Sequence, residues 1–456
     1  MKILLVSYFF APANTMGALR ITRLANYLTQ RCHEVRVLTA DDPAWPPTLD
    51  CDFPGEHVQR TPQVDINWLP RRLARLRRRS GIANTSACAA GGPSNPPRIA
   101  SPGPGARLLR GASALHINAL NWPDSRAGWL PYAWRVGRNL VRSWRPDLVY
   151  ASSPPPTGLL VGKLLAAHGG IPWVAEFRDR WSDDPYYAKP AWRQAMEARL
   201  ERRIVASASA IVTVSEPWAA RYAEAYGKPT LVVLNGFEPN DYAERESTGA
   251  VRVRGLEIVY TGSIYPGRRD PTPLFRALAS IAEGAAQVRL HFYGTDPKHV
   301  LPLAAEAGVH DRVLVHPHVP RAEAVALQQR ADVLLLMQWN DPREQGNLPG
   351  KLFEYLGARR PILGLGLESG VPATIIRARA AGCFTNDPTR IAAQLAAWLD
   401  TKRRLGRLPP LPPEVAAGFT RAEQFAKLEQ FLGLACDVGR APHLRLKTSR
   451  LPRQYR

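Results

Sequence analysis

Short runs of apolar, β-branched residues alternate along this chain with segments in which apolar positions recur every three or four residues. The first pattern is typical of strands buried on both faces, and the second of amphipathic helices. The N-terminal segment illustrates both, because the run Ile3–Val6 is followed by a helical pattern. The apolar face of that helix consists of Ile21, Leu24, Ala25 and Leu28. Alternation of this kind predicts βαβ units built around parallel sheets.

Two groups of predicted strands divide the chain into two α/β domains. The strands expected in the first half are Ile3–Val6, Val35–Thr39, Leu148–Ala151, Trp173–Phe177, Ala210–Val214 and Leu231–Leu234. Those expected in the second half are Ile258–Tyr260, Val288–Tyr293, Val313–Val315, Val333–Leu336 and Ile362–Leu365. The polar stretch 238–255 separates the two groups. We therefore expect Rossmann-like, doubly wound parallel-sheet domains over 1–240 and 255–410, facing each other across a ligand-binding cleft.

Three segments fall outside this pattern. Residues 81–106 are rich in Gly, Ala, Ser and Pro and hold almost no large apolar side chains, which predicts disorder within an insertion at about 70–110. A final helix is expected within 411–436, packed back on the N-terminal domain. Its apolar positions include Phe425, Leu428 and Phe431. The remainder, 437–456, is expected to be a loose basic tail.

Positive charge is concentrated in two blocks of this chain, whose formal net charge is +21. Residues 440–456 hold basic side chains and no acid, and 71–79 do the same. The arginines of the second block are Arg71, Arg72, Arg75, Arg77, Arg78 and Arg79. Interleaved leucines give that block an amphipathic helical pattern, so contact with an anionic membrane is expected rather than with nucleic acid. The alternative is that a high genomic GC content raises the arginine content throughout.

Cysteine usage and hydropathy bear on the compartment. The five cysteines are widely spaced and form no Cys-x-x-Cys pair, which favours a reducing environment. No apolar run approaches the ~18 residues that would cross a bilayer. The opening residues also resemble a signal peptide, but the run Ile3–Val6 and the helix after it favour a buried strand. We expect a cytoplasmic protein, with peripheral attachment to the inner face of the cytoplasmic membrane.

The segment 346–358, with the sequence GNLPGKLFEYLGA, is a short polar loop that runs into a helix. Lys351 falls in the first turn and Glu354 lies about 4.5 Å further along the axis on the same face. A helix start carries unpaired N–H groups and partial positive charge, so this end suits a diphosphate. Glu354 would then accept hydrogen bonds from ribose hydroxyls. The alternative is a surface helix with an ordinary ion pair between the two residues.

A second candidate is the turn after the first strand of the C-terminal domain. Gly262 and Ser263 follow that strand directly, and Arg268 and Arg269 come a few residues later. These arginines could reach an anion held at Gly262. Together with Lys351 they would stabilise the charge that develops on a departing nucleoside diphosphate. The alternative is a solvated loop.

Polar residues also follow strands of the N-terminal domain. Gly17 lies near the first helix start and allows close approach of a ligand to the backbone. Asp179 follows a strand with Arg178 beside it, and we expect Asp179 to contact sugar or acceptor hydroxyls. Ser152 and Ser153 end the preceding strand and would line the acceptor side with Arg178. The alternative is an Arg178–Asp179 pair that only shapes the loop.

Two short segments contain the residue types of metal-binding motifs, but we do not interpret them as metal sites. Asp50 and Asp52 lie in a proline-rich loop rather than after an apolar strand. His316 and His318 lack a third ligand nearby, so they are interpreted as loop residues. Neither motif is therefore interpreted as a metal site.

Taken in order, these segments resemble the family 4 glycosyltransferases, which are retaining, nucleotide-sugar-dependent enzymes of the GT-B fold. The resemblance covers about residues 1–60 and 110–435 and is nearest to a polysaccharide-assembly subgroup. The segments that carry it read LTQRCHEVRVLT, WVAEFRDRWS, VLNGFEP, YTGSIYPGRRDP and LPGKLFEYLGARRPIL.

The resemblance implies that the second domain binds the donor and the first binds the acceptor. Arg268 and Lys351 would hold the diphosphate, Glu354 the ribose, and Gly262 would form the phosphate-side loop. Gly17 would face the donor phosphates from the first domain. The resemblance also implies transfer on one sugar face, with no metal and no cofactor required besides the nucleotide-sugar substrate. The leaving phosphate would help to deprotonate the acceptor.

Three positions depart from the family pattern. Gly346 stands where the first Glu of an E-x₇-E pair is expected, and Glu344 or Asn347 is expected to take over its contact with the sugar. Two serines replace the histidine often found after the strand ending near Ala151. Cys32 replaces the glycine expected after the first helix, where a left-handed backbone is easy only for glycine.

The function expected is transfer of a sugar from a UDP- or GDP-sugar to a hydroxyl of a glycan or lipid-linked acceptor, in cell-surface or extracellular polysaccharide or glycolipid synthesis. One alternative is a nucleotide-sugar 2-epimerase. Another is a catalytically degenerate, basic membrane-binding protein. The sugar, the base and the linkage are not determined by the sequence.

Overall fold

The computed structural model describes residues 1–67, 121–187, 189–242, 255–281 and 288–440. These residues form two compact units. The first unit ends at Leu234 and takes up the chain again at Phe425, and the second comprises the residues between them. The insertion expected at about 70–110, including its arginine block, lies outside the described residues, and so does most of the tail expected over 437–456.

A seven-stranded parallel sheet forms the core of the first unit, in the order β3-β2-β1-β4-β5-β6-β7. Its strands are β1 (Lys2–Ser7), β2 (Glu34–Asp41), β3 (Val58–Pro62), β4 (Leu148–Ser153), β5 (Trp173–Phe177), β6 (Ala210–Thr213) and β7 (Thr230–Val232). In the central strand β1, Ile3 lies opposite Val35 on one side and Leu148 on the other. The sequence predicted every one of these strands except β3, which is largely polar and ends in a proline.

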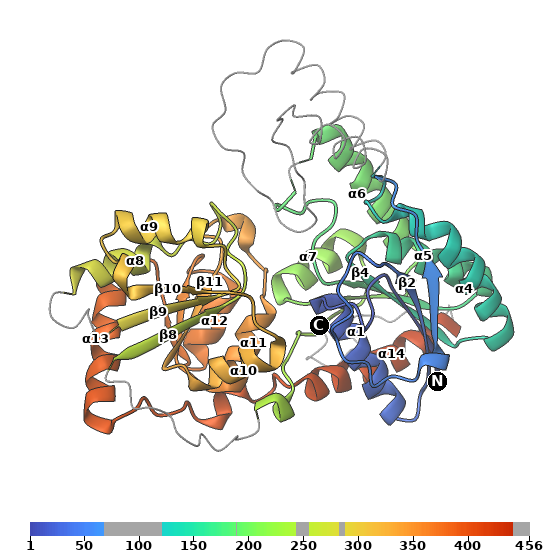
Figure 1. Ribbon diagram of the computed structural model, residues 1–456. Coiled ribbons are helices and arrows are strands. Elements are labelled where there is room, and N and C mark those ends of the chain that lie inside the picture. The colour runs from blue at the N-terminus through green and yellow to red at the C-terminus, as the bar shows by residue number, and fades with distance from the viewer. Residues whose placement is uncertain (68–120, 188, 243–254, 282–287, 441–456) are drawn as a thin grey trace, which may run out of the picture. The chain divides into compact units, whose positions relative to one another are not determined.

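Helices cover both faces of this sheet (Figure 1). They are α1 (Met16–Gln30), α4 (Leu130–Trp144), α5 (Thr157–Gly169), α6 (Ala191–Val205), α7 (Glu216–Tyr226) and α14 (Arg421–Arg440). One apolar cluster joins α4, α5, α6 and α7 to one face, and a second joins α1 and α14 to the other. The last helix begins within the segment expected over 411–436 and extends beyond its end.

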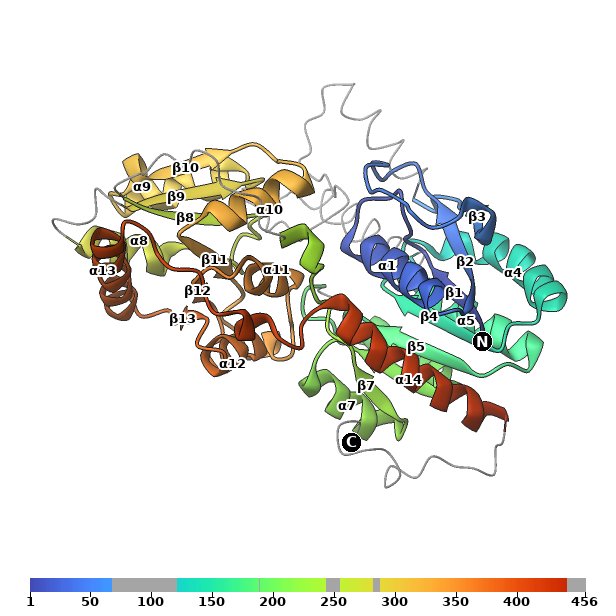
Figure 2. The ribbon, with the colours of Figure 1, turned by 90° about the horizontal axis from the view of Figure 1, so that it is seen from below.

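The last helix packs beside α1 on the first unit (Figure 2). Phe425 and Leu428 share an apolar cluster with Leu24. The ring centroids of Tyr27 and Phe425 are 5.7 Å apart, and the Tyr27 hydroxyl donates a hydrogen bond to Glu429 at 3.1 Å. The C-terminal helix thereby completes the core of a sheet whose strands all come from the first 234 residues.

A six-stranded parallel sheet, in the order β10-β9-β8-β11-β12-β13, forms the core of the second unit. Its strands are β8 (Leu256–Thr261), β9 (Val288–Tyr293), β10 (Val313–His316), β11 (Val333–Met337), β12 (Ile362–Leu365) and β13 (Gly382–Phe384). Only the three-residue strand β13 was not predicted, because so short a run gives no periodic signal. The predicted class of two α/β domains with doubly wound parallel sheets is confirmed.

The helices of the second unit are α8 (Thr272–Ser280), α9 (Leu301–Glu306), α10 (Arg321–Arg330), α11 (Gly350–Ala358), α12 (Val371–Ala378) and α13 (Pro388–Leu405). Residues of α8, α9 and α13 share the main apolar cluster with the strands, while α10 and α11 contact β8 and β11 respectively. None of the helices in the described part of the chain combines the length and apolar character that a membrane span requires.

The turn after α1 has the left-handed backbone that the sequence led us to expect at Cys32. Its φ is 63°, and its N–H donates to the carbonyl of Thr29 at 3.0 Å. The N–H of His33 donates to the carbonyl of Leu28, also at 3.0 Å. These two bonds define a Schellman motif, in which glycine is the usual residue at the position that Cys32 occupies.

Candidate active site

The ammonium group of Lys351 lies against the backbone of Gly262. Lys351 is in the first turn of α11, and Gly262 follows β8 with a φ of 125°. A Cβ on residue 262 would lie 2.9 Å from Cε of Lys351 and closer still to Nζ. The ammonium also lies 4.2 Å from the ring centroid of Tyr260. Residue 262 must therefore be glycine for two reasons, its backbone conformation and the space that Lys351 fills.

The start of α11 is suited to an anion. No side chain caps this helix, so the N–H groups of its first turn have no side-chain partner. Burial lowers the pKa of Lys351. Burial of Tyr260 would raise its pKa, but the charges of Lys351 and Arg269 outweigh that effect and lower it. A concentrated positive potential thus exists at the end of β8.

Both arginines of the turn after β8 lie on aromatic rings and are partly exposed. The guanidinium carbon of Arg269 is 4.3 Å from the Tyr265 centroid, and Nη1 donates to the carbonyl of Ser263 at 2.8 Å. The guanidinium carbon of Arg268 is 4.7 Å from the ring centroid of Trp339. Trp339 follows β11, the neighbour of β8 in the sheet. Arg268 and Lys351 are therefore both held at the carboxyl ends of adjacent strands.

Glu354 is paired with Arg321 and not with Lys351. Nη1 of Arg321 lies 2.6 Å from Oε1 of Glu354, and the same guanidinium reaches Asp241 at 3.0 Å. Gln328 donates to Oε2 of Glu354 at 3.4 Å. The alternative of an ordinary ion pair along α11 is wrong for these residues, because no ion pair in the described structure joins Lys351 to Glu354.

Residue 346, where the family pattern has Glu, adopts a backbone that favours glycine. The φ of Gly346 is 87°. Glu344, two residues earlier, is buried and accepts a hydrogen bond from the side chain of Asn347 at 2.7 Å. The residues predicted to take over the role of the missing Glu thus contact each other beside Gly346.

In the first unit, the guanidinium of Arg178 covers Gly17 at the start of α1. Nε of Arg178 donates to Oγ of Ser152 at 3.1 Å, and Nη2 donates to the carbonyl of Pro154 at 2.8 Å. A Cβ on residue 17 would lie 2.7 Å from Nη2. Thr15 caps the helix by accepting from the N–H of Ala18 at 3.0 Å. The predicted residues Gly17, Ser152 and Arg178 are thus brought together.

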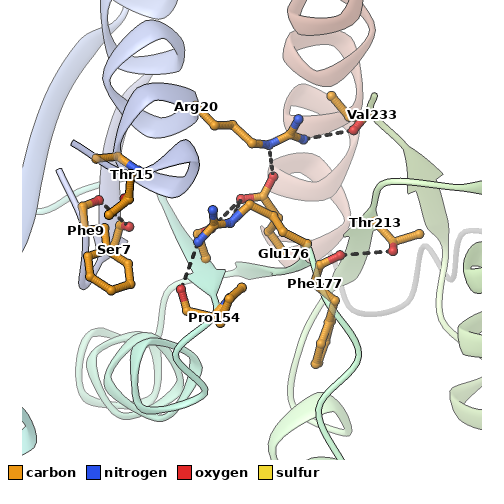
Figure 3. Close-up of polar contacts among 12 residues, drawn as sticks. Ser7, Phe9, Thr15, Arg20, Pro154, Glu176, Phe177, Thr213 and Val233 are labelled. Carbon is orange, nitrogen blue, oxygen red and sulfur yellow. Dashed lines mark hydrogen bonds and ion pairs between the residues drawn. The ribbon is translucent and has the colours of Figure 1, made fainter. Parts of the chain in front are cut away.

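A buried carboxylate holds this cluster in place (Figure 3). Glu176, the fourth residue of β5, is fully buried and pairs with Nε of Arg20 at 2.8 Å. It also accepts from Ser152 at 2.5 Å and lies 4.0 Å from Arg178. Arg20 also donates to the carbonyls of Val233 and Leu234 at 3.0 and 2.9 Å. Burial would raise the pKa of Glu176, but the two arginines outweigh it and lower the pKa.

The other predicted residues of the first unit lie close by. Ser153 is buried, and its carbonyl accepts from the N–H of Arg178 at 3.0 Å. Asp179 lies two residues beyond the end of β5. Burial raises the pKa of Asp179 and the charge of Arg178 opposes this, so the alternative in which the two pair to shape the loop stays a prediction. Of the discounted residues, Asp52 pairs with Arg23 at the surface.

Sequence reasoning missed four residues of these clusters, namely Arg20, Glu176, Tyr260 and Arg321. Glu176 carried a usable signal, since a carboxylate inside the apolar strand sequence WVAEF has to find a buried partner. Arg20 carried the complementary signal on the buried face of α1. Neither pattern says which residue is the partner, because the two are distant in the chain and meet only when the sheet forms.

Two family models match the chain, and together they cover more than half of it. The glycosyl transferase 4-like domain matches residues 71–237, and the glycosyl transferases group 1 domain matches residues 255–401. The fold and these matches place the chain among the GT-B glycosyltransferases. It belongs to the family 4 type of these enzymes, as the resemblance predicted.

A curated relative and several solved structures are similar to the chain. The D-inositol 3-phosphate glycosyltransferase of Xylanimonas cellulosilytica is 29% identical over 160 residues, which is 31% of this chain and only 38% of the relative's length. The sucrose-phosphate synthase of Thermosynechococcus elongatus has a TM-score of 0.60 and 15% identity. HepE of Anabaena, solved in complex with UDP and glucose, has a TM-score of 0.58 and 14% identity. Each of these two similarities covers 95% of this chain and 100% of the solved one, and at such identities they show a shared fold.

Proposed function

We propose that this protein transfers a sugar from a nucleoside diphosphate sugar, carrying UDP or GDP, to a hydroxyl of an acceptor, with retention at the anomeric carbon. The observation that carries the proposal is the Lys351 ammonium held on Gly262 at the uncapped start of α11. Structures of HepE, which has the same fold, contain UDP and UDP-glucose, and this supports a nucleotide-sugar donor.

Sugar transfer requires fixed positive charge close to the leaving diphosphate. When the bond between the anomeric carbon and the β-phosphate oxygen breaks, the electron pair stays with the diphosphate. Lys351, Arg268 and the N–H groups of the first turn of α11 would stabilise that charge, so the second unit would bind the donor without a metal. Glu354 would accept hydrogen bonds from the ribose hydroxyls, on the lone pairs that its bonds to Arg321 and Gln328 leave available.

The first unit would supply the acceptor site. We assign the acceptor side to Arg178, Ser152 and Ser153, with Asp179 contacting acceptor or sugar hydroxyls and Gly17 meeting the donor phosphates. The acceptor hydroxyl attacks the anomeric carbon, and its proton passes to the departing phosphate oxygen. A glycan or lipid-linked acceptor in cell-surface or extracellular polysaccharide or glycolipid synthesis fits the subgroup that the sequence resembles.

Nucleotide binding tests the donor site directly. UDP, GDP and their sugars should raise the melting temperature of the wild-type protein by binding only the folded state. Lys351→Met should weaken nucleotide binding about tenfold or more, because a charge-assisted hydrogen bond contributes about 1.5–3 kcal/mol. Lys298→Met removes an exposed lysine of the same unit and should leave binding unchanged. A wild-type protein that binds no nucleotide would refute the proposal and favour a degenerate, non-catalytic protein.

Product analysis separates transfer from epimerisation. Incubation with the donor alone should give slow release of free sugar and nucleoside diphosphate. An epimerised nucleotide-sugar under these conditions would favour the 2-epimerase alternative.

A further inference from the structure

Helices α4, α5 and α6 lie side by side on one face of the first unit's sheet (Figure 1), and their outer surface carries no acidic side chain. Neither α4 nor α5 contains Asp or Glu. The two glutamates of α6 are turned inward, with Glu197 only 1% and Glu201 only 2% exposed. Glu197 pairs with Lys189 and Arg193, and Glu201 accepts from the hydroxyl of Tyr226.

The same surface is rich in basic groups. The exposed arginines are Arg135 and Arg142 on α4 and Arg199, Arg202 and Arg203 on α6. Two lysines cover the C-terminal end of α6, where carbonyl groups carry partial negative charge. Lys163 donates to the carbonyl of Arg203 at 3.0 Å, and Lys228 donates to that of Ala206 at 2.8 Å. The outer surface of these three helices therefore carries exposed basic side chains and no exposed carboxylate.

Large apolar side chains are exposed at the beginning of this layer. Tyr187 is 66% exposed, Trp192 46% and Met196 42%. On α6, Trp192, Met196, Arg199 and Arg203 follow one another at intervals of three or four residues and form a single stripe. We call these four residues the α6 stripe. Trp and Tyr with neighbouring arginines are the side chains that membrane interfaces favour.

The apolar end of the layer lies at the edge of the sheet where the acceptor-side residues are found. In a βαβ unit the helix runs antiparallel to its strands, so α4 and α6 begin at the carboxyl edge of the sheet. Arg193 at the start of α6 bonds the carbonyl of Pro123, in the loop that leads to α4, at 3.4 Å. Ser152 lies near the end of β4, and Arg178 directly follows β5, at that edge.

We propose that the outer surface of α4–α6 docks on an anionic phospholipid bilayer, with the α6 stripe as its main contact. The arginines attract the lipid phosphates, and Trp192 and Met196 bury apolar surface in the headgroup region. Exposed apolar side chains distinguish this surface from a purely basic nucleic-acid site. Docked in this way, the carboxyl edge of the first unit would lie close to the lipid headgroups.

Vesicle flotation with the full-length protein tests the inference. The wild type should bind vesicles that contain phosphatidylglycerol and not vesicles of phosphatidylcholine alone. Trp192→Ser/Arg199→Glu/Arg203→Glu should lower the partition coefficient at least ~30-fold, because each basic residue near an anionic surface contributes about 1 kcal/mol. The matched control is Arg403→Glu/Arg404→Glu/Leu405→Ser, which makes the same charge change and removes an exposed leucine on α13 of the second unit. Its partition coefficient should stay within about twofold of wild type.

Several outcomes would overturn the inference. Equal loss of binding in both triple variants would show that only net charge matters, and no loss in the α6 variant would place the contact elsewhere. If the wild type binds an oligonucleotide and not vesicles, and the α6 variant no longer binds the oligonucleotide, the surface is assigned to nucleic acid. A wild-type dimer that the α6 variant converts to a monomer would assign it to a second copy of the chain. Unchanged melting temperatures of both variants are required for the comparison, and single substitutions at Trp192 or Arg199 replace the triple variant if it unfolds.

Discussion

The guanidinium of Arg178 fills the space that a side chain on residue 17 would need. An ideal Cβ on Gly17 would lie 2.7 Å from Nη2 and 2.9 Å from Cζ of Arg178. Glycine at this position is therefore explained by the group that covers it and not by an unusual backbone. The sequence predicted close approach of a ligand to the backbone of Gly17, and in the structure the guanidinium of Arg178 occupies that space.

Gly17→Ala should displace Arg178 from its bonds to Ser152 and Pro154. Because the guanidinium is pinned by those bonds, we expect a loss of about 1–3 kcal/mol in the free energy of unfolding, measured by urea denaturation. Gly55→Ala is the control, since no atom lies within 4 Å of its ideal Cβ, and it should change stability by less than ~0.5 kcal/mol. In an Arg178→Ala background the cost of Gly17→Ala should largely disappear, and full additivity of the two changes would contradict this explanation.

Nucleotide affinity should depend on pH through Lys351. Its pKa is lowered by burial, so between that folded-state pKa and the unfolded value of about 10.4 the unfolded chain binds more protons. The free energy of unfolding of the ligand-free protein should therefore rise with pH in that window. A bound diphosphate favours the charged lysine, so UDP affinity should fall with pH over the same range. Calorimetric titrations at several pH values would test this, and Lys351→Met should flatten both profiles while Lys298→Met preserves them.

Glu176→Gln should destabilise the first unit severely. Gln has the same shape but leaves the buried Arg20 without a counter-charge, and breaking such a pair costs about 3–5 kcal/mol. The lowered pKa of Glu176 means that its ionised form contributes stability above the unfolded value of about 4.3 and that this is lost as pH falls through the folded-state pKa.

Urea unfolding at neutral and acidic pH measures both effects of Glu176. Asp400→Asn is the control, because Asp400 and its partner Arg403 are both exposed, and it should cost about 1 kcal/mol or less. Similar losses for the two variants would show that the Glu176–Arg20 pair has no special role.

Cys32→Gly should stabilise the protein. A left-handed backbone costs a non-glycine residue about 1–2 kcal/mol, which glycine avoids. The greater conformational freedom of glycine in the unfolded chain offsets about 0.5–1 kcal/mol of this gain. A net gain of about 0.5–1 kcal/mol is expected in urea unfolding. Cys32→Ala keeps the strain and should give no gain, so equal stabilisation by both substitutions would point to removal of the thiol as the cause.

Gly346→Glu should not improve turnover, although it restores the family residue. The φ of 87° makes any side chain at 346 cost about 1–2 kcal/mol. If Glu344 has taken over the role of the missing Glu, Glu344→Gln should lower turnover of the donor, whereas Glu306→Gln, at an exposed carboxylate of the same unit, should not. Faster transfer by Gly346→Glu would show that the site had simply lost its carboxylate.

Local patterns of apolar and polar residues determine much of the architecture. The apolar runs of β1, β4, β5 and β11 are buried along their whole length, so their composition alone marks them as central strands of parallel sheets. The strands that escaped prediction, β3 and β13, are short or polar and lie at sheet edges, where burial imposes little pattern. Candidate residues such as Gly262 and Lys351 were found because turns after strands and helix starts have recognisable residue types.

Partnerships were decided only by the tertiary structure. Glu354 has Lys351 within reach along its helix, yet it pairs with Arg321 from a different helix. Glu176 on β5 likewise pairs with Arg20 on α1. The sequence by itself determined which segments become strands and helices and which ends of them carry charge, because hydrophobic burial and backbone preferences act over a few residues. The tertiary structure alone decided the charge partners and the cation that covers each glycine. The reason is that only the packing of helices on the sheets brings distant residues within a few ångströms of one another.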